Sequence, residues 1–254
     1  MQIILGRPHR LENIFLMRHA NSAANADNSV NAEMPDHKIP LVPSGPAQAR
    51  AAGRAFDDFV SAGYKIRSNS MRLWHSTYLR ADMTAHEMLL DMGESFYKIK
   101  DIYPSIFLTE QRFGLFDGLS EDEKAARFPD QYADFKKWEE NGGKFYARMP
   151  QGESRYDVAM RAHQFFGTII RDAEKPRNNV PNVFIVSHGT TIRAFVMMWL
   201  HRNPEWFDQE PNPNNCSIRH LARGPSGRWE DRGYIFDGFP DQEALRKAGE
   251  KVKD

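Results

Sequence analysis

The sequence has little of what marks a secreted or membrane-spanning chain. Its 254 residues include a single cysteine, Cys216, so no intrachain disulfide can form, and a lone thiol is more typical of a reducing compartment than of a secreted protein. No apolar run approaches the ~18 residues that a membrane-spanning helix needs, and the run before Arg7 is too short for the core of a signal peptide. We therefore expect a cytoplasmic protein that does not contact a membrane.

An excess of charge of either sign is also lacking. The 34 Lys and Arg residues balance the 34 Asp and Glu residues, so net charge gives no reason to expect a nucleic acid or an anionic membrane as partner. Any anion site must therefore be local. With 41% hydrophobic and 27% charged residues, the chain is of ordinary globular composition. We expect a single domain over residues 1–254.

Alternating strand and helix patterns predict an α/β fold. Short apolar runs predict strands at 13–17, 70–75, 182–186 and 217–223. Helical spacing of apolar residues predicts helices at 46–60, 78–92, 154–172 and 192–200. This order indicates a three-layer α/β/α sandwich with a mostly parallel sheet.

Two further segments differ in character from this framework. Between 106 and 153, Gly, Pro, Asp and aromatic residues are interleaved with one polar helical stretch at 121–140, which predicts a lid inserted over the core. The polar tail at 241–254 predicts a loose terminal helix.

Two of the predicted strands end in a histidine beside small residues. His19 follows Arg18, and His188 precedes Gly189. Ligands of open α/β sheets bind at the carboxyl ends of the strands, so neighbouring strands would bring both histidines together, with Arg80 on the same rim. Each of these residues alone is more often a structural or solvated side chain. Together they predict a phosphoryl site, because arginine forks bracket phosphate oxygens and a histidine can act as nucleophile near neutral pH.

Several separate motifs, in order along the chain, resemble those of the histidine phosphatase superfamily, also called phosphoglycerate mutase-like proteins. The segment 16–25 (LMRHANSAAN) is similar to the family's Arg-His-Gly box with its downstream asparagine. Further similar segments are 40–49 (PLVPSGPAQA), 76–85 (STYLRADMTA), 108–114 (LTEQRFG), 151–154 (QGES) and 187–190 (SHGT). The chain departs from the family pattern at Ala20, His75 and Thr109.

The resemblance implies a mechanism and a set of site residues. His19 would attack phosphorus to form a phosphohistidine, and Glu110 would act as general acid and then as general base. Residues implied to hold the phosphate or the transition-state charge are Arg18, Asn25, Arg80, His188 and Gly189. No cofactor and no metal are implied, and the expected partner is a small phosphorylated metabolite.

The segments 113–120 (FGLFDGLS) and 128–132 (FPDQY) look more like the broad phosphatase branches than like the glycolytic mutases. They favour hydrolysis of a phosphomonoester. A phosphoglycerate-type phosphomutase and a catalytically silent protein that binds a phosphorylated ligand are the alternatives. Glu153 is expected to cap or orient the helix that follows it. The sequence identifies neither the substrate nor the oligomeric state, and it leaves a dimer open.

Overall fold

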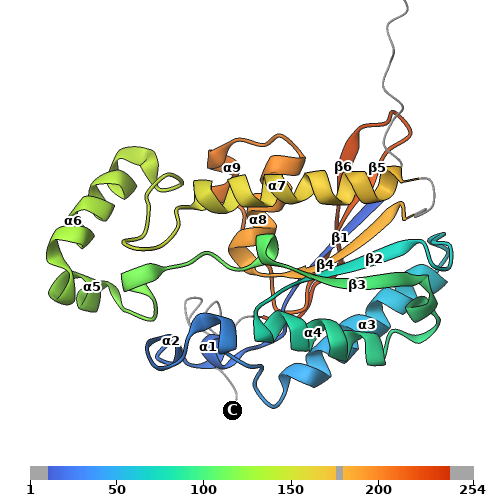
Figure 1. Ribbon diagram of the computed structural model, residues 1–254, viewed down its shortest axis with the longest axis horizontal. Helices are drawn as coiled ribbons and strands as arrows, with labels where there is room; N and C mark the ends of the chain where they lie inside the picture. The colour runs from blue at the N-terminus through green and yellow to red at the C-terminus, as the bar shows by residue number, and fades with distance from the viewer. Residues whose placement is uncertain (1–10, 176–179, 241–254) are drawn as a thin grey trace, which may run out of the picture.

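The computed structural model describes residues 11–175 and 180–240, and these contain one six-stranded sheet with the order β3-β2-β4-β1-β5-β6 (Figure 1). Strands β1 to β4 run parallel to one another, whereas β5 is antiparallel to both of its neighbours. The strands are β1 (Asn13–Arg18), β2 (Met71–Ser76), β3 (Ile99–Ser105), β4 (Asn182–Ser187), β5 (Ile218–Arg223) and β6 (Trp229–Phe236). The predicted α/β fold with a mostly parallel sheet is confirmed.

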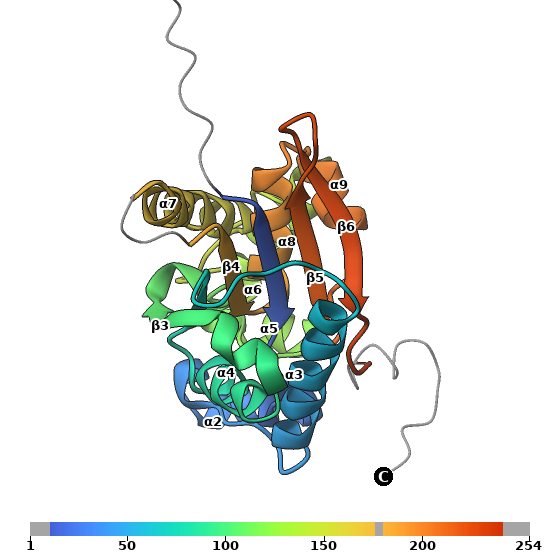
Figure 2. The ribbon, with the colours of Figure 1, turned by 90° about the vertical axis from the view of Figure 1, so that its right-hand side faces the viewer.

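Helices cover both faces of the sheet, as Figures 1 and 2 show. On one face lie α3 (Gly45–Ser61) and α4 (Leu79–Leu90), and on the other α7 (Arg155–Glu174) and α8 (Gly189–Trp199). Successive side chains of a strand point to opposite faces. In β1, accordingly, Phe15 and Met17 belong to the core under α3 and α4, while Ile14 and Leu16 belong to the core under α7 and α8.

The two edge strands, β3 and β6, were not predicted from the sequence. Both carry charged residues and lack a clean apolar run: β3 reads IKDIYPS and β6 reads WEDRGYIF. Every residue of the central strands β1 and β4 is buried, whereas most residues of β3 and β6 are not. An edge strand has less need of apolar residues, so its periodicity is weak.

The segment 106–153 does not contain the single helix predicted at 121–140. It forms α5 (Glu121–Arg127) and α6 (Pro129–Trp138), because a residue before proline disfavours helical geometry and the chain turns at Phe128. Figure 1 shows both helices to one side of the sheet. The predicted tail helix at 241–254 lies outside the described residues.

The helix predicted at 192–200 begins earlier, at Gly189, so the residues after His188 form its first turn. The shorter elements are α1 (Ala23–Ala26), α2 (Val30–Glu33), α9 (Pro204–Gln209) and several 3-10 turns, among them Asp36–Lys38. In the part of the chain that the structure describes, no helix is both long and apolar enough to span a membrane.

Candidate active site

The carboxyl ends of β1 and β4 bring the two predicted histidines together. The strands are parallel neighbours in which Arg18 pairs with Ser187, so His19 and His188 follow at the same edge of the sheet. Their ring centroids are 5.0 Å apart. The convergence expected from the sequence is therefore present.

His19 is oriented by a hydrogen bond from its own ring. Its Nδ1 lies 2.7 Å from the carbonyl oxygen of Ala20, and because a carbonyl only accepts, Nδ1 carries the proton and Nε2 keeps its lone pair. Burial, together with the nearby Arg80 and Arg18, holds the pKa of His19 well below its usual range. His19 is therefore neutral near pH 7, the form that a nucleophile needs.

The backbone around this ring is also fixed. The N–H of Ala20 donates to Oγ1 of Thr84 at 2.9 Å. Among the described residues, the non-glycine positions with positive φ do not include Ala20. Alanine in place of the family's glycine is therefore accommodated without backbone strain at this position.

His188 is fully buried beside His19. Its Nε2 lies 2.8 Å from Oγ of Ser76, whose oxygen also accepts the N–H of Tyr78 at 3.2 Å. This arrangement allows the serine hydroxyl to donate to Nε2, and in that tautomer the histidine proton is on Nδ1. Within the described part of the chain, that buried Nδ1 has no hydrogen-bond partner. Burial, Arg80 and His19 lower the pKa of His188 well below its usual value.

The two predicted arginines are both buried at the site. Nη1 of Arg18 donates to the carbonyl oxygen of Pro213 at 2.8 Å. Nη1 of Arg80 donates to both the carbonyl oxygen and Oδ1 of Asp36, each at 2.7 Å. Each guanidinium is thus fixed in place before any ligand arrives, which is the preorganisation that charge stabilisation requires.

Glu110 is held at the beginning of α8. Its Oε2 accepts the N–H of Thr190 at 3.3 Å, and its Oε1 accepts the N–H of Gln111 at 2.9 Å. Because α8 begins at Gly189, this carboxylate lies at the positive end of the helix dipole. The start of α8 at Gly189 therefore places the N–H of Thr190 where it can bind Glu110.

The sequence predicts that Glu153 caps or orients α7, and of these two roles it does not have the capping one. Ser154 provides the cap by accepting the N–H of Asp157. Instead, the Glu153 carboxylate binds Nε of Arg161 at 3.0 Å, and Nη2 of that arginine donates to the carbonyl oxygen of Glu110 at 3.0 Å. Glu153 therefore positions the backbone that carries Glu110.

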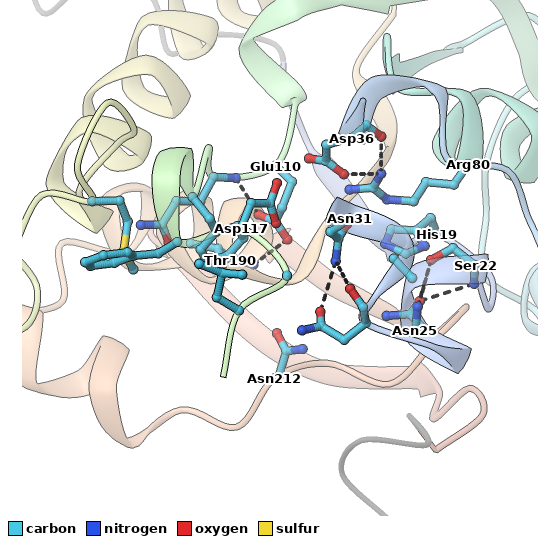
Figure 3. Close-up of a pocket in the computed structure, with 18 of the residues that line it drawn as sticks. His19, Ser22, Asn25, Asn31, Asp36, Arg80, Glu110, Asp117, Thr190 and Asn212 are labelled. Carbon is cyan, nitrogen blue, oxygen red and sulfur yellow. Dashed lines mark hydrogen bonds and ion pairs between the residues drawn. The ribbon is translucent and has the colours of Figure 1, made fainter. Parts of the chain in front are cut away.

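Arg18, His19, Arg80 and Glu110 line a cavity of about 670 Å³ (Figure 3). Figure 3 shows His19 and Arg80 on one side and Glu110 with Thr190 on the other. Asn25 and Asn212 also line it.

The remaining predicted phosphate ligands differ in their placement. Oδ1 of Asn25 accepts from the backbone N–H of Ser22 at 3.2 Å and from its hydroxyl at 3.0 Å. Because these bonds occupy Oδ1, the side-chain NH₂ group is the part of Asn25 that can donate to a ligand. Gly189 lies at the first position of α8, where a Cβ would come 2.0 Å from Oδ1 of Asn212. Neither His188 nor Gly189 is among the cavity-lining residues.

The comparisons with known proteins agree with this geometry. Residues 14–232 match the family described as histidine phosphatase superfamily (branch 1). The chain belongs to this superfamily. A curated relative, the phosphoglycerate mutase-like protein AT74H of Arabidopsis thaliana, is 34% identical over 224 residues, which cover 85% of this chain and 75% of the relative.

Solved structures of phosphatases share the fold. A putative alpha-ribazole-5'-P phosphatase from Escherichia coli superposes with a TM-score of 0.67 and 16% identity, over 90% of this chain and 98% of the other. A mycobacterial glucosyl-3-phosphoglycerate phosphatase superposes with a TM-score of 0.61 and 20% identity, over 89% and 99%. At these identities the likeness concerns the fold.

The structure places further residues at the candidate site that were not predicted from the sequence. Asp36 holds Arg80, and Asp117 lines the same cavity. Burial and the nearby Asp36 raise the pKa of Asp117 to about 6. The loop before β5 supports His19, since Nδ2 of Asn215 donates to the carbonyl oxygen of His19 at 3.0 Å. Asp36 lies in a polar turn without a motif, and Asp117 lies in the segment 113–120, where no site residue was predicted, so tertiary proximity reveals both aspartates.

Among the described residues, no group of three or more His, Cys, Asp or Glu side chains is arranged to hold a metal ion. Arg18 and Arg80 supply positive charge beside His19, and Lys124, Arg155 and Arg193 also line the cavity.

Proposed function

We propose that this protein is a phosphomonoester hydrolase that works through a phosphohistidine on His19. The observation that carries the proposal is the state of that ring. Its Nδ1 is fixed on the carbonyl oxygen of Ala20 at 2.7 Å, and its neutral form is favoured beside Arg18 and Arg80. A neutral, oriented imidazole between two guanidinium groups is suited to attack a phosphoryl group.

In the first step, Nε2 of His19 forms a bond to phosphorus while the bond from phosphorus to the ester oxygen breaks. Glu110, across the cavity, delivers a proton to the leaving alkoxide. In the second step, the Glu110 carboxylate takes a proton from water as the water oxygen bonds to phosphorus and the bond from phosphorus to Nε2 of His19 breaks. Inorganic phosphate leaves, and His19 and protonated Glu110 are regenerated.

The non-bridging oxygens carry negative charge throughout both steps. Arg18 and Arg80 neutralise it with charge-assisted hydrogen bonds, and Nδ1 of His188 and the amide of Asn25 supply further donors. Positive charge built into the chain gives transition-state stabilisation without assigning a metal to that task. Residues 106–153, which carry Glu110 and Asp117, act as a lid over the single domain in this proposal.

The substrate class in this proposal is a small phosphorylated metabolite. The lone cysteine, Cys216, is buried, and it supports a reducing, cytoplasmic location. A phosphomutase would use the same phosphohistidine but return the phosphoryl group to the bound organic product. A silent binding protein would retain affinity for phosphate without turnover.

The test is steady-state hydrolysis of para-nitrophenyl phosphate, with and without EDTA, by the unmodified protein and by His19→Ala. His86→Ala is the matched control, because His86 has an exposed side chain on α4. We expect activity that resists EDTA, that is lost in His19→Ala and that persists in His86→Ala, together with an acid-labile phosphoenzyme. Transfer between phosphoglycerate positions without release of phosphate would instead establish the mutase, and phosphate binding without turnover the silent protein.

A further inference from the structure

Two arginines that the proposed chemistry does not use lie in the same cavity. Arg155 is the first residue of α7, and Arg193 lies in α8. Both guanidinium groups lie against the ring of Phe207, at 5.3 and 4.5 Å from its centroid. Two separate helices therefore bring these cations together at one wall of the cavity.

The position of Arg193 on α8 relates this wall to the catalytic acid. Arg193 follows Thr190 by one helical turn, so the two residues share a face of α8. The N–H of Thr190 binds the carboxylate of Glu110 at 3.3 Å. A substrate whose ester oxygen lies beside Glu110 would thus extend its organic part toward Arg193.

Arg193 differs from other arginines of the protein in its partners. Arg72, Arg161 and Arg219 each bind at least one carboxylate, and Arg80 binds Asp36. In contrast, the hydrogen bonds given for Arg193 go from Nη1 to the carbonyl oxygens of residues 207 and 210, at 3.5 and 3.3 Å. Its buried Nε has no hydrogen-bond partner in the described part of the chain.

Nearby charges also disfavour the positive charge of Arg193. Burial and the neighbouring Arg155 lower the pKa of Arg193 to about 10, against the opposing effect of Glu110 and Asp208. Asp208 forms its ion pair with Arg155 rather than with Arg193. Among the described residues, Arg193 therefore has no carboxylate in direct contact, because the carboxylate of Asp208 contacts Arg155. Leaving a partly buried cation without a contacting counterion costs free energy, and an anionic ligand would offset that cost.

We propose that Arg193, supported by Arg155, binds a carboxylate on the organic part of the substrate, so that the preferred substrates are phosphomonoesters of carboxylic acids. A carboxylate fits because it carries a single charge and matches the planar fork of a guanidinium. The inference rests on the proposed hydrolase function for its kinetic test, but not for the binding test described below.

Matched substrates isolate the carboxylate. The pair 3-phosphoglycerate and glycerol 3-phosphate differ by a carboxylate in place of a hydroxymethyl group. The open-chain compounds 6-phosphogluconate and sorbitol 6-phosphate provide a longer pair that differs in the same way. For the better-fitting pair we expect kcat/KM to favour the carboxylate member by about tenfold to hundredfold, the range for hydrogen bonds to charged groups. In Arg193→Gln this preference should fall at least tenfold, and in Arg155→Gln by less.

Arg148→Gln is the control, since Arg148 is an exposed arginine outside the cavity that pairs with Asp157. It should keep the preference of the unmodified protein. If Arg193→Gln fails to fold, Arg155→Gln decides the question. Equal kcat/KM values within both pairs, an undiminished preference in the arginine variants, or a stronger preference for fructose 1,6-bisphosphate over fructose 6-phosphate would overturn the proposal.

A binding measurement separates this inference from the proposed function. Calorimetric titration of His19→Ala with 3-phosphoglycerate and glycerol 3-phosphate, and with the longer pair, needs no turnover. Tighter binding of a carboxylate member, lost when Arg193→Gln is added, would support the subsite even if para-nitrophenyl phosphate were not hydrolysed. Equal affinities within both pairs, in a protein that does hydrolyse para-nitrophenyl phosphate, would sink the subsite alone.

Discussion

The rings of His19 and His188 lie 5.0 Å apart with their planes at 59°, and they are held by different neighbours. Nδ1 of His19 is bound to the carbonyl oxygen of Ala20, whereas Nε2 of His188 is bound to the hydroxyl of Ser76. In the proposed mechanism, the pair presents one nitrogen lone pair and one N–H to a phosphoryl group. This asymmetry would let two histidines at the same sheet edge perform different tasks.

Replacing His188 should lower the rate of phosphoryl transfer more than it weakens substrate binding. In His188→Ala the donor at the position of Nδ1 is removed, and we expect kcat on para-nitrophenyl phosphate to fall about 10²- to 10³-fold, as for loss of one preorganised transition-state donor. Rapid-quench measurement of phosphoenzyme formation checks which step is slowed. A variant that raises KM but keeps kcat would show that His188 acts only in binding.

Glu110 should matter in proportion to how much protonation the leaving group needs. For Glu110→Gln we expect a loss of about 10²- to 10⁴-fold with alkyl phosphates. The loss should be smaller with para-nitrophenyl phosphate, whose nitrophenolate departs without a proton. Comparison of kcat/KM across phenyl phosphates of graded leaving-group pKa tests this. Equal losses on all substrates would remove Glu110 as the acid.

The central strands and the two histidine boxes could be predicted from the sequence because both leave local signals. Strands β1 and β4 are buried throughout and read as apolar runs, and each ends directly at its histidine. The edge strands β3 and β6 leave weak signals because solvent covers part of them. The break between α5 and α6 was present at Phe128-Pro129, but the charged residues on both sides conceal it.

The missed site residues are those whose role depends on distance in space. Nothing local marks Asp36 as the partner of Arg80, which lies in a different element. Likewise, Asn212 faces Gly189, and Asn215 supports His19, from a loop far along the chain. Sequence patterns predict the side chains that the proposed chemistry uses, whereas the side chains that hold them in place become visible only after folding.

The carboxyl group of Asp117, which lines the cavity, should make the stability of the folded protein depend on pH. Burial first, and then Asp36, raises the pKa of its carboxyl in the folded protein to about 6, while Arg80 and the N–H of Gly118 oppose this. An unfolded aspartate has a pKa of about 3.9. The folded protein therefore binds this proton more tightly, so ionised Asp117 destabilises the fold fully above about pH 6 and not at all below about pH 4.

The corresponding variant is Asp117→Asn, which cannot ionise. Thermal unfolding at pH 7.5 should give a Tm roughly 2–4 °C above that of the unmodified protein, which corresponds to about 1 kcal/mol after allowance for partial solvation. At pH 4 the two Tm values should coincide. Asp134→Asn, an exposed aspartate on α6, should show no such pH-dependent difference. An equal gain at both pH values would assign the effect to packing instead of charge.

Within the segment 106–153, the backbone at Gly114 packs directly against the backbone at Pro150. The stability of the protein should therefore require a residue without a side chain at position 114. The φ of Gly114 is +60°, and a Cβ would lie 2.1 Å from the carbonyl oxygen of Pro150, which itself accepts the N–H of Leu115 at 2.9 Å. Gly142 is the matched control, with φ +75° and no atom within 4 Å of the added Cβ. Gly142→Ala should cost about 1 kcal/mol of unfolding free energy through its backbone conformation alone. Gly114→Ala adds a clash with backbone, so denaturant titration should show a loss above about 2 kcal/mol. Equal losses would mean that the contact between residues 114 and 150 relaxes freely.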